Sequence, residues 1–284
     1  MTLAAGAVGP AASPESLESF GEADVERRFG GLRRLYGDAG YARIRATHVA
    51  VVGVGGVGSW AVEALARSGV ASLTLIDLDH VSESNVNRQV QALGSTLGQA
   101  KVEALRERIA DIHPGCVVHA VDAFVEEGNW PALLPAPVHV LIDACDDVRA
   151  KTTLAAWARA TGTPLLIVGA AGGKRAAERV EVGDLADVTH DPMLASLRQR
   201  LRKHHGGPRS GPFGLTCVFS REPVAMPVDE ACAIDGSEAI DGSLNCHGYG
   251  SSVAVTATFG MVAAARALEF VALPKARPGS PAAL

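Results

Sequence analysis

The chain has few cysteines, few aromatic residues and few charges for its length. It contains five cysteines in 284 residues, and no two of them form a C-x-x-C pair. This argues against a disulfide framework and against a four-cysteine zinc site, so we expect reduced thiols, no zinc and a cytoplasmic protein. Aromatic residues make up 5%, so Val, Leu, Ile and Ala must fill the core. The net charge of −5 argues against nucleic-acid binding over the whole surface, although it allows a local basic patch.

The two ends of the chain differ in composition from the rest. No basic start followed by an apolar run opens the chain, so a secretory signal is not predicted. Residues 1–22 and 275–284 are predicted to be disordered arms around a single domain, 23–274. Residues 251–273 are rich in Ala and Val, but Arg266 and Glu269 interrupt the run. A buried helix therefore explains it better than a membrane span, and membrane association is not expected.

Short apolar runs alternate with helical patterns in the middle of the chain. The runs at 49–52, 73–76, 117–121, 138–142 and 165–168 suit strands buried on both faces, and helices are predicted at 59–68, 99–112 and 149–161. This alternation predicts an α/β fold with a Rossmann-like, doubly wound, mostly parallel sheet. Residues 49–169 would form the nucleotide-binding core. Residues 170–250 are expected to form substrate-side loops with one helix near 192–205, an irregular C-terminal extension of the same domain.

A glycine-rich loop follows the first predicted strand. Gly53-Val54-Gly55-Gly56-Val57-Gly58 fits G-x-G-x-x-G, and Asp77 lies 19 residues after Gly58 at the end of the next strand. The glycines permit a tight turn beside phosphate at a helix N-terminus, and the carboxylate suits a ribose hydroxyl. The pattern favours nucleotide binding over a glycine turn made only for packing.

Charged residues beyond the loop separate an ATP site from a dinucleotide site. Arg88 and Lys101 could neutralise a triphosphate, whereas an NAD site needs little charge beyond the loop and the acid. Both could instead be surface charges. Asp143, Asp146 and Asp147 cluster at the end of another strand. Such a cluster is costly unless it binds Mg²⁺ or caps a helix; Asp146 is the metal candidate and Asp147 a candidate cap.

These motifs together resemble the adenylation domain of ubiquitin-activating and ThiF/MoeB-type enzymes. Further segments resemble the TcdA (CsdL) group of tRNA threonylcarbamoyladenosine dehydratases; they are Arg28-Phe29-Gly30-Gly31, Arg34-Leu35-Tyr36-Gly37, Asn85-Val86-Asn87-Arg88-Gln89, Gly169-Ala170-Ala171-Gly172-Gly173, Cys217-Val218-Phe219-Ser220 and Thr256-Ala257-Thr258-Phe259-Gly260. The similarity extends from about Glu26 to Leu268. It implies an ATP-dependent enzyme that adenylates the threonine carboxylate of a modified adenosine, which lies beside the anticodon of tRNA, and then closes a ring. It also implies a homodimer and Mg²⁺.

The resemblance assigns roles by motif position. The ATP-binding residues it implies are Gly53, Gly55, Gly56, Gly58, Asp77, Asp79, Asn85, Arg88, Gln89 and Lys101. Asp146 would hold Mg²⁺, and Arg88, Lys101 and Asp146 would be catalytic. Arg28 is the candidate for an arginine that reaches the partner's ATP, although this chain has glycine where relatives often have a second arginine. Cys246 resembles a loop cysteine suspected to act in the dehydratases; an inert, packed thiol is the alternative.

A basic stretch is hidden within the acidic chain. No acidic residue lies between Pro192 and Arg221, and the candidates for tRNA contact there are Arg198, Arg200, Arg202, Lys203 and Arg209. An ordinary solvated helix face is the alternative.

Other functions remain open at this point. The principal alternative is a MoeB/ThiF-type activator of a small sulfur-carrier or ubiquitin-like protein, which the missing C-x-x-C pairs disfavour. An NAD-dependent oxidoreductase and a non-catalytic nucleotide-binding scaffold are further alternatives. The residues leave open whether a monovalent cation binds and whether there is a cysteine desulfurase or sulfur-acceptor partner.

Overall fold

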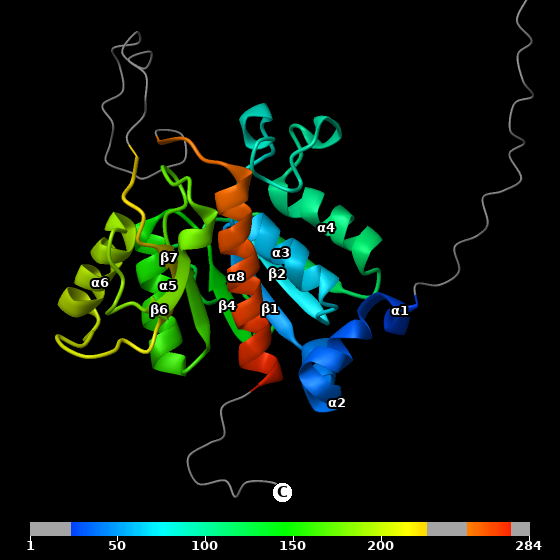
Figure 1. Cartoon of the computed structure of the whole chain (residues 1–284), viewed down its shortest axis with the longest axis horizontal. Coiled ribbons are helices and arrows are strands. Elements are labelled where there is room, and N and C mark those ends of the chain that lie inside the picture. The colour runs from blue at the N-terminus through cyan, green and yellow to red at the C-terminus, as the bar shows by residue number, and fades with distance from the viewer. Residues whose placement is uncertain (1–23, 226–248, 274–284) are drawn as a thin grey trace, which may run out of the picture.

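The computed structural model describes residues 24–225 and 249–273 (Figure 1). The predicted arms, Cys232 and Cys246 lie outside the described residues. The helices are α1 (Val25–Phe29), α2 (Gly31–Arg45), α3 (Gly58–Arg67), α4 (Lys101–Ile112), α5 (Val148–Thr161), α6 (Pro192–His204) and α8 (Val253–Ala272), with 3-10 turns η2 (Glu83–Asn85), η3 (Gly94–Thr96) and η4 (Ala177–Arg179). The strands are β1 (His48–Val52), β2 (Ser72–Ile76), β3 (Val117–Val121), β4 (Val140–Asp143), β5 (Leu165–Val168), β6 (Val180–Asp184) and β7 (Thr216–Ser220).

The strands form one seven-stranded sheet in the order β3-β2-β1-β4-β5-β7-β6. All neighbours are parallel except β6, which runs antiparallel to β7 at one edge. The predicted mostly parallel, doubly wound sheet is confirmed. The strand order reverses between β1 and β4, and a ligand crevice is expected outside the carboxyl ends of the strands at such a point.

Two hydrophobic layers cover the two faces of the sheet. Alternate residues of β1 divide between them: Val49 and Val51 join the layer with α3, α4 and α8, whereas Ala50 and Val52 join the layer with α5 and α6. This division explains why the central strands β1, β4 and β5 read as apolar runs, because both of their faces are buried.

The last helix, α8, crosses one face of the sheet beside α3 (Figure 1). Its length and mean hydropathy of 1.4 would also suit a membrane span, the one such helix among the described residues. However, Phe259, Ala263 and Ala267 are buried in the core, which confirms the predicted buried helix.

Two features differ from the expectation for this chain. Residues 170–250, expected to form loops and one helix, also contribute β6 and β7 to the sheet. The helices α1 and α2 were not predicted, and α2 contains Gly37 with φ 69°. A glycine in this left-handed conformation interrupts the helical pattern, which hides the element from a periodicity argument.

Candidate nucleotide site at the switch point of the sheet

A cavity of about 660 Å³ lies at the carboxyl ends of the central parallel strands. Its walls come from the glycine loop after β1, the segment after β2, the 144–147 loop after β4 and the 169–172 loop after β5. The predicted site residues that line it are Gly53, Gly55, Gly56, Asp77, Asp79, Asn85, Arg88, Gln89, Lys101 and Asp146. The fold therefore brings together residues up to 93 positions apart in the sequence.

Different structural constraints require glycine at the positions of the loop. Gly53 has φ +79°, and a Cβ there would approach the Cys145 backbone nitrogen to 2.7 Å. Gly58 does not line the cavity; a Cβ on it would collide with the Gly53 carbonyl oxygen, so it serves the tight turn. No described side chain caps the start of α3. Its first N–H groups can therefore meet a phosphate.

Asp77 braces the glycine loop from the end of β2. One carboxylate oxygen accepts from the Val54 N–H at 2.8 Å, and the other accepts from the Asp79 N–H at 2.9 Å. Burial raises the pKa of Asp77, while the nearby Lys101 ammonium opposes that shift. Each carboxylate oxygen has further acceptor capacity, so a ribose hydroxyl could also bind here.

Two cations are held inside the cavity wall. Arg88 and Lys101 are only 8% and 6% exposed. Arg88 donates to the Ser84 carbonyl at 2.7 Å, and Lys101 forms an ion pair with Asp79 at 2.6 Å. Buried cations at a cavity are unlike solvated surface charges, and they can stabilise a polyphosphate in a low-dielectric setting.

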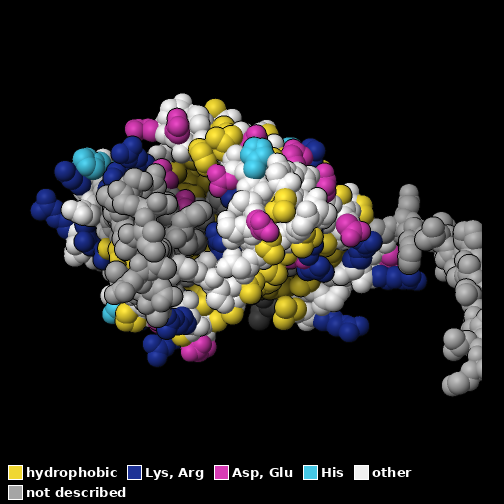
Figure 2. All heavy atoms as spheres, turned by 90° about the horizontal axis from the view of Figure 1, so that it is seen from above, with side chains coloured by type: hydrophobic (Ala, Val, Ile, Leu, Met, Phe, Trp, Pro, Cys, Tyr) yellow, Lys and Arg dark blue, Asp and Glu magenta, His cyan; other side chains and the backbone are white. Residues whose placement is uncertain are grey.

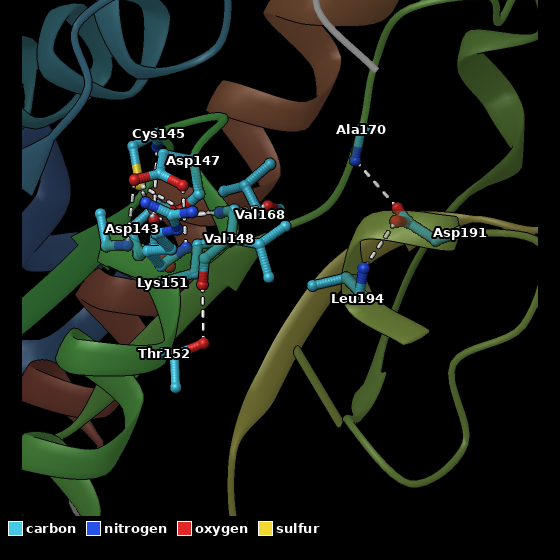
Figure 3. Close-up of polar contacts among 12 residues, drawn as sticks. Asp143, Cys145, Asp147, Val148, Lys151, Thr152, Val168, Ala170, Asp191 and Leu194 are labelled. Carbon is cyan, nitrogen blue, oxygen red and sulfur yellow. Dashed lines mark hydrogen bonds and ion pairs between the residues drawn. The ribbon is translucent and has the colours of Figure 1, made fainter. Parts of the chain in front are cut away.

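The three aspartates at the end of β4 and directly after it have three separate environments; Figure 3 shows those of Asp143 and Asp147. Asp143 is fully buried and forms an ion pair with Lys151 at 3.0 Å. Asp147 caps α5, accepting from the Arg149 N–H at 2.8 Å, as predicted. Asp146 lines the cavity, is exposed and makes no side-chain hydrogen bond or ion pair with the described residues. It is thus the carboxylate of the three that remains available to a ligand.

The Asp146 carboxylate fits the way proteins hold Mg²⁺. No group of three or more candidate ligands occurs among the described residues. Mg²⁺ beside a nucleotide usually takes only one or two protein carboxylates, and phosphate oxygens and water complete its shell. One free carboxylate beside the glycine loop is therefore compatible with such a site.

Several residues that shape the cavity were not predicted. Lys151 donates to Asp143 at the end of β4 and to the Val168 carbonyl at the end of β5 at 2.8 Å, so it joins the carboxyl ends of two neighbouring strands. Burial alone would lower the pKa of Lys151, but Asp143 and the other acidic neighbours raise it. Burial and Asp143 raise the pKa of Cys145 well above its usual range. Lys151 has no local sequence signal, because its partner Val168 is brought to it by the tertiary fold.

Asp191 connects α6 to the cavity (Figure 3). It is 3% exposed; one oxygen accepts from the Leu194 N–H at 3.0 Å and caps α6. The other accepts from the Ala170 N–H at 2.8 Å, in the loop that lines the cavity.

The remaining predicted residues lie away from the cavity. Arg28 donates to the carbonyls of Asp111 and Ile112 at the end of α4. Arg198 points inward to the carbonyls of Leu185 and Val188. Arg202 donates to the Pro208 carbonyl and lies over the Phe213 ring. Arg200, Lys203 and Arg209 are exposed and make no side-chain hydrogen bond or ion pair with the described residues. Lys and Arg side chains gather at the end of the molecule that carries α6 (Figure 2).

The fold and the site define a class of protein. A Rossmann-like sheet, a glycine loop at its switch point, two buried cations and a free carboxylate form a cavity whose chemistry suits the polyphosphate of a nucleotide. Residues 29–279 match the ThiF family, and the chain belongs to that family.

The chain is similar over most of its length to tRNA threonylcarbamoyladenosine dehydratases. It is 42% identical over 258 residues to the Escherichia coli (strain K12) enzyme, covering 89% of this chain and 96% of that protein. The Haemophilus influenzae enzyme is 38% identical, with 87% and 94% covered. The crystal structure of the E. coli enzyme in complex with ATP superimposes with a TM-score of 0.77, 41% identity and coverage of 87% of this chain and 94% of that chain.

A second group of relatives matches less of the chain. Molybdopterin-synthase adenylyltransferase of E. coli (strain K12) is 36% identical over 127 residues, which cover 45% of this chain. The dehydratases are therefore the nearer of the two groups.

Proposed function

We propose that this protein is an ATP-dependent tRNA threonylcarbamoyladenosine dehydratase. The observation that carries the proposal is the cavity itself, where buried Arg88 and Lys101 and the free carboxylate Asp146 face a glycine loop. The E. coli dehydratase, similar over most of this chain, was crystallised in complex with ATP and with AMP, which supports an AMP-forming reaction.

The proposed reaction has two steps. An oxygen of the threonine carboxylate attacks the α-phosphorus of ATP, and the bond from that phosphorus to the bridging oxygen breaks to release pyrophosphate. A nucleophile of the same side chain then attacks the acyl carbon; a ring bond forms, the bond to AMP breaks and a proton leaves. The carboxylate oxygen departs with AMP, so the nucleoside loses the elements of water. Ring closure within one side chain gains a large effective molarity.

The residues of the cavity divide these tasks. Asp77 would hold the ribose with Asp79 beside it, and the glycine loop and the start of α3 would hold the phosphates. Arg88 and Lys101 would stabilise charge that develops on the triphosphate, with Asn85 and Gln89 beside them. Asp146 would hold Mg²⁺, which when bound supplies further charge stabilisation at the phosphates.

The decisive test is mass spectrometry of tRNA nucleosides after incubation with the protein and ATP. We expect threonylcarbamoyladenosine to lose the mass of water while AMP and pyrophosphate form in equal amounts. Arg88→Ala and Asp146→Asn should lower the rate at least ~100-fold, in the range found when a transition-state charge partner is removed. Asp187→Asn is the matched control, because Asp187 is exposed, lies outside the cavity and has no side-chain partner among the described residues.

The same experiment distinguishes the dehydratase from a MoeB/ThiF-type activator of a carrier protein. Pyrophosphate release that requires a carrier protein ending in Gly-Gly, with no change in the tRNA nucleoside, would refute the dehydratase and favour a MoeB/ThiF-type activator. The described cysteines, Cys116, Cys145 and Cys217, are spread over 102 positions, which does not suit a zinc-binding C-x-x-C pair.

We further propose a cytoplasmic homodimer with a single domain over 23–274. The resemblance to ThiF/MoeB-type enzymes supports the dimer, and Leu35, which is 72% exposed, and Met261 on α8, which is 41% exposed, are candidates for its interface. Light scattering after size-exclusion chromatography should give twice the chain mass, and a monomer would contradict this. Contacts to the tRNA backbone are proposed for Arg200, Lys203 and Arg209. We assign no described residue to a monovalent cation or to a cysteine desulfurase or sulfur-acceptor partner; Cys246 lies outside the described residues.

A further inference from the structure

A second cavity, of about 860 Å³, lies next to the nucleotide cavity. We call it the α5–α6 groove; it is formed by the exposed sides of α5 and α6 and by segment 125–130. Val125, Glu126, Asp147 and Ala150 line both cavities, so the groove shares a wall with the proposed ATP site. A substrate held in the groove could extend from there towards the reacting atoms.

The groove offers an aromatic surface. Trp157 of α5 and Trp130 both line it, in an edge-to-face contact with ring centroids 5.3 Å apart. The buried Trp130 indole N–H has no acceptor among the described residues, although buried donors ordinarily find one. Aromatic side chains at the edge of a nucleic-acid site commonly stack with unpaired bases.

The helices that form the groove carry its cations, and segment 125–130 carries carboxylates. Arg149 stands at the start of α5, and Arg200 and His204 lie one turn apart on α6. Segment 125–130 contributes Glu126 and Glu127. Asp147 also lines the groove, but its carboxylate is occupied by N–H groups of α5. Cations on the helices suit a phosphate, whereas carboxylates suit the exocyclic amine of a base.

We propose that the α5–α6 groove binds a nucleotide of the tRNA anticodon loop that flanks the modified adenosine. This rests on the proposed function. The base of that nucleotide stacks beside Trp157, and its phosphate meets Arg200 and Arg149. The modified adenosine, one nucleotide away, then enters the neighbouring cavity past the shared wall.

The test is a titration of the full-length protein with an unmodified anticodon stem–loop RNA, followed by tryptophan fluorescence. Stacking of a base on Trp157 should quench the emission, and Trp157→Phe should lower that quenching at least ~2-fold while the RNA still binds. This variant keeps an aromatic ring beside Trp130. Arg200→Ala should reduce the slope of the logarithm of the binding constant against the logarithm of salt concentration by about 0.7, the value for one phosphate contact of a single strand.

Arg179→Ala is the matched control. Arg179 is exposed and unpaired among the described residues, but η4 packs against α8 in the layer on the other face of the sheet. The proposal is overturned if Trp157→Phe keeps the wild-type quenching, if Arg200→Ala keeps the wild-type slope as Arg179→Ala should, or if the stem–loop does not bind. Nucleoside mass spectrometry separates the failure of this proposal from the failure of the proposed function. If the wild-type protein converts tRNA but the groove variants bind the stem–loop as the wild type does, only the role of the groove is refuted. If the wild-type protein does not convert tRNA, the proposed function is refuted.

Discussion

The buried ion pair between Lys151 and Asp143 permits a quantitative prediction about stability. Both side chains are fully buried, and their charged atoms are 3.0 Å apart. Replacing Lys151 by Met keeps an unbranched apolar stem up to the position of Cε but leaves the Asp143 carboxylate without its cation. Removing one partner of a buried pair costs about 3–5 kcal/mol, because a charge then stays buried without compensation.

The expected loss has identifiable parts. Besides the ion pair, the Val168 carbonyl loses the donor that Lys151 supplies at 2.8 Å, and one buried unsatisfied acceptor costs about 1–3 kcal/mol. These contributions overlap, so we expect Lys151→Met to lower the free energy of unfolding by about 3–5 kcal/mol in total. Adding Asp143→Asn removes the stranded charge, so the double variant should be more stable than the sum of the two single effects by at least ~1 kcal/mol.

Urea unfolding followed by circular dichroism measures all four species of this cycle. Lys203→Met is the control, because Lys203 is exposed on α6 and its loss should change the midpoint little. A loss below about 1 kcal/mol for Lys151→Met, or additive single effects, would refute the reasoning that the pair is buried and mutually dependent.

Three further predictions concern other parts of the described chain. Asp191→Ala should lower the free energy of unfolding by about 1 kcal/mol or more, because α6 loses its cap. It should also weaken ATP binding, because the Ala170 N–H loses its hydrogen-bond acceptor. Asp191→Asn should retain most of the stability, and equal urea midpoints for the two variants would contradict this. Burial lowers the pKa of His48 below its usual 6.5, so the unfolded chain binds more protons than the folded one, and the free energy of unfolding should fall as the pH drops through and below about 6.5. His48→Gln should make this fall smaller in urea midpoints measured from pH 7.5 to 5.5. An unchanged dependence on pH would contradict the prediction. Burial raises the pKa of Cys116 to about 11, so iodoacetamide should alkylate Cys116 slowly in the native protein at pH 8. Peptide mass spectrometry measures the extent of labelling, and fast labelling of Cys116 would contradict the prediction.

The fold was predictable where both faces of a strand are buried. All five residues of β1 are buried, and the four that follow His48 form an uninterrupted apolar run. The edge strand β6 does not, because Glu181, Gly183 and Asp184 interrupt it and its residues are only partly buried. β7 is mostly buried, but the Gly- and Pro-containing segment before it concealed a five-residue strand.

The candidate site was predictable where local chemistry defines it. The glycine loop, Asp77 and the pair Arg88 and Lys101 follow from motifs, and all of them line or brace one cavity. Lys151 and Asp191 could not be found this way, because they are recognisable only by the contacts that the fold gives them: Lys151 with the end of β5, and Asp191 with Ala170 in the loop after β5. The sequence pattern also overstated the basic stretch, since Arg198 and Arg202 satisfy carbonyls of their own fold.

The two hydrogen bonds of Asp191 have a consequence for the energetics of the two ligands. One carboxylate is committed both to the helix that borders the α5–α6 groove and to the loop that borders the nucleotide cavity, so a ligand that shifts one element changes the free energy of the other. Thermodynamic linkage then requires that ATP alter the affinity for RNA by the same factor by which RNA alters the affinity for ATP. Titrations of stem–loop RNA with and without a non-hydrolysable ATP analogue should differ, and Asp191→Ala should reduce that difference; equal affinities in wild type would show that the two sites act independently.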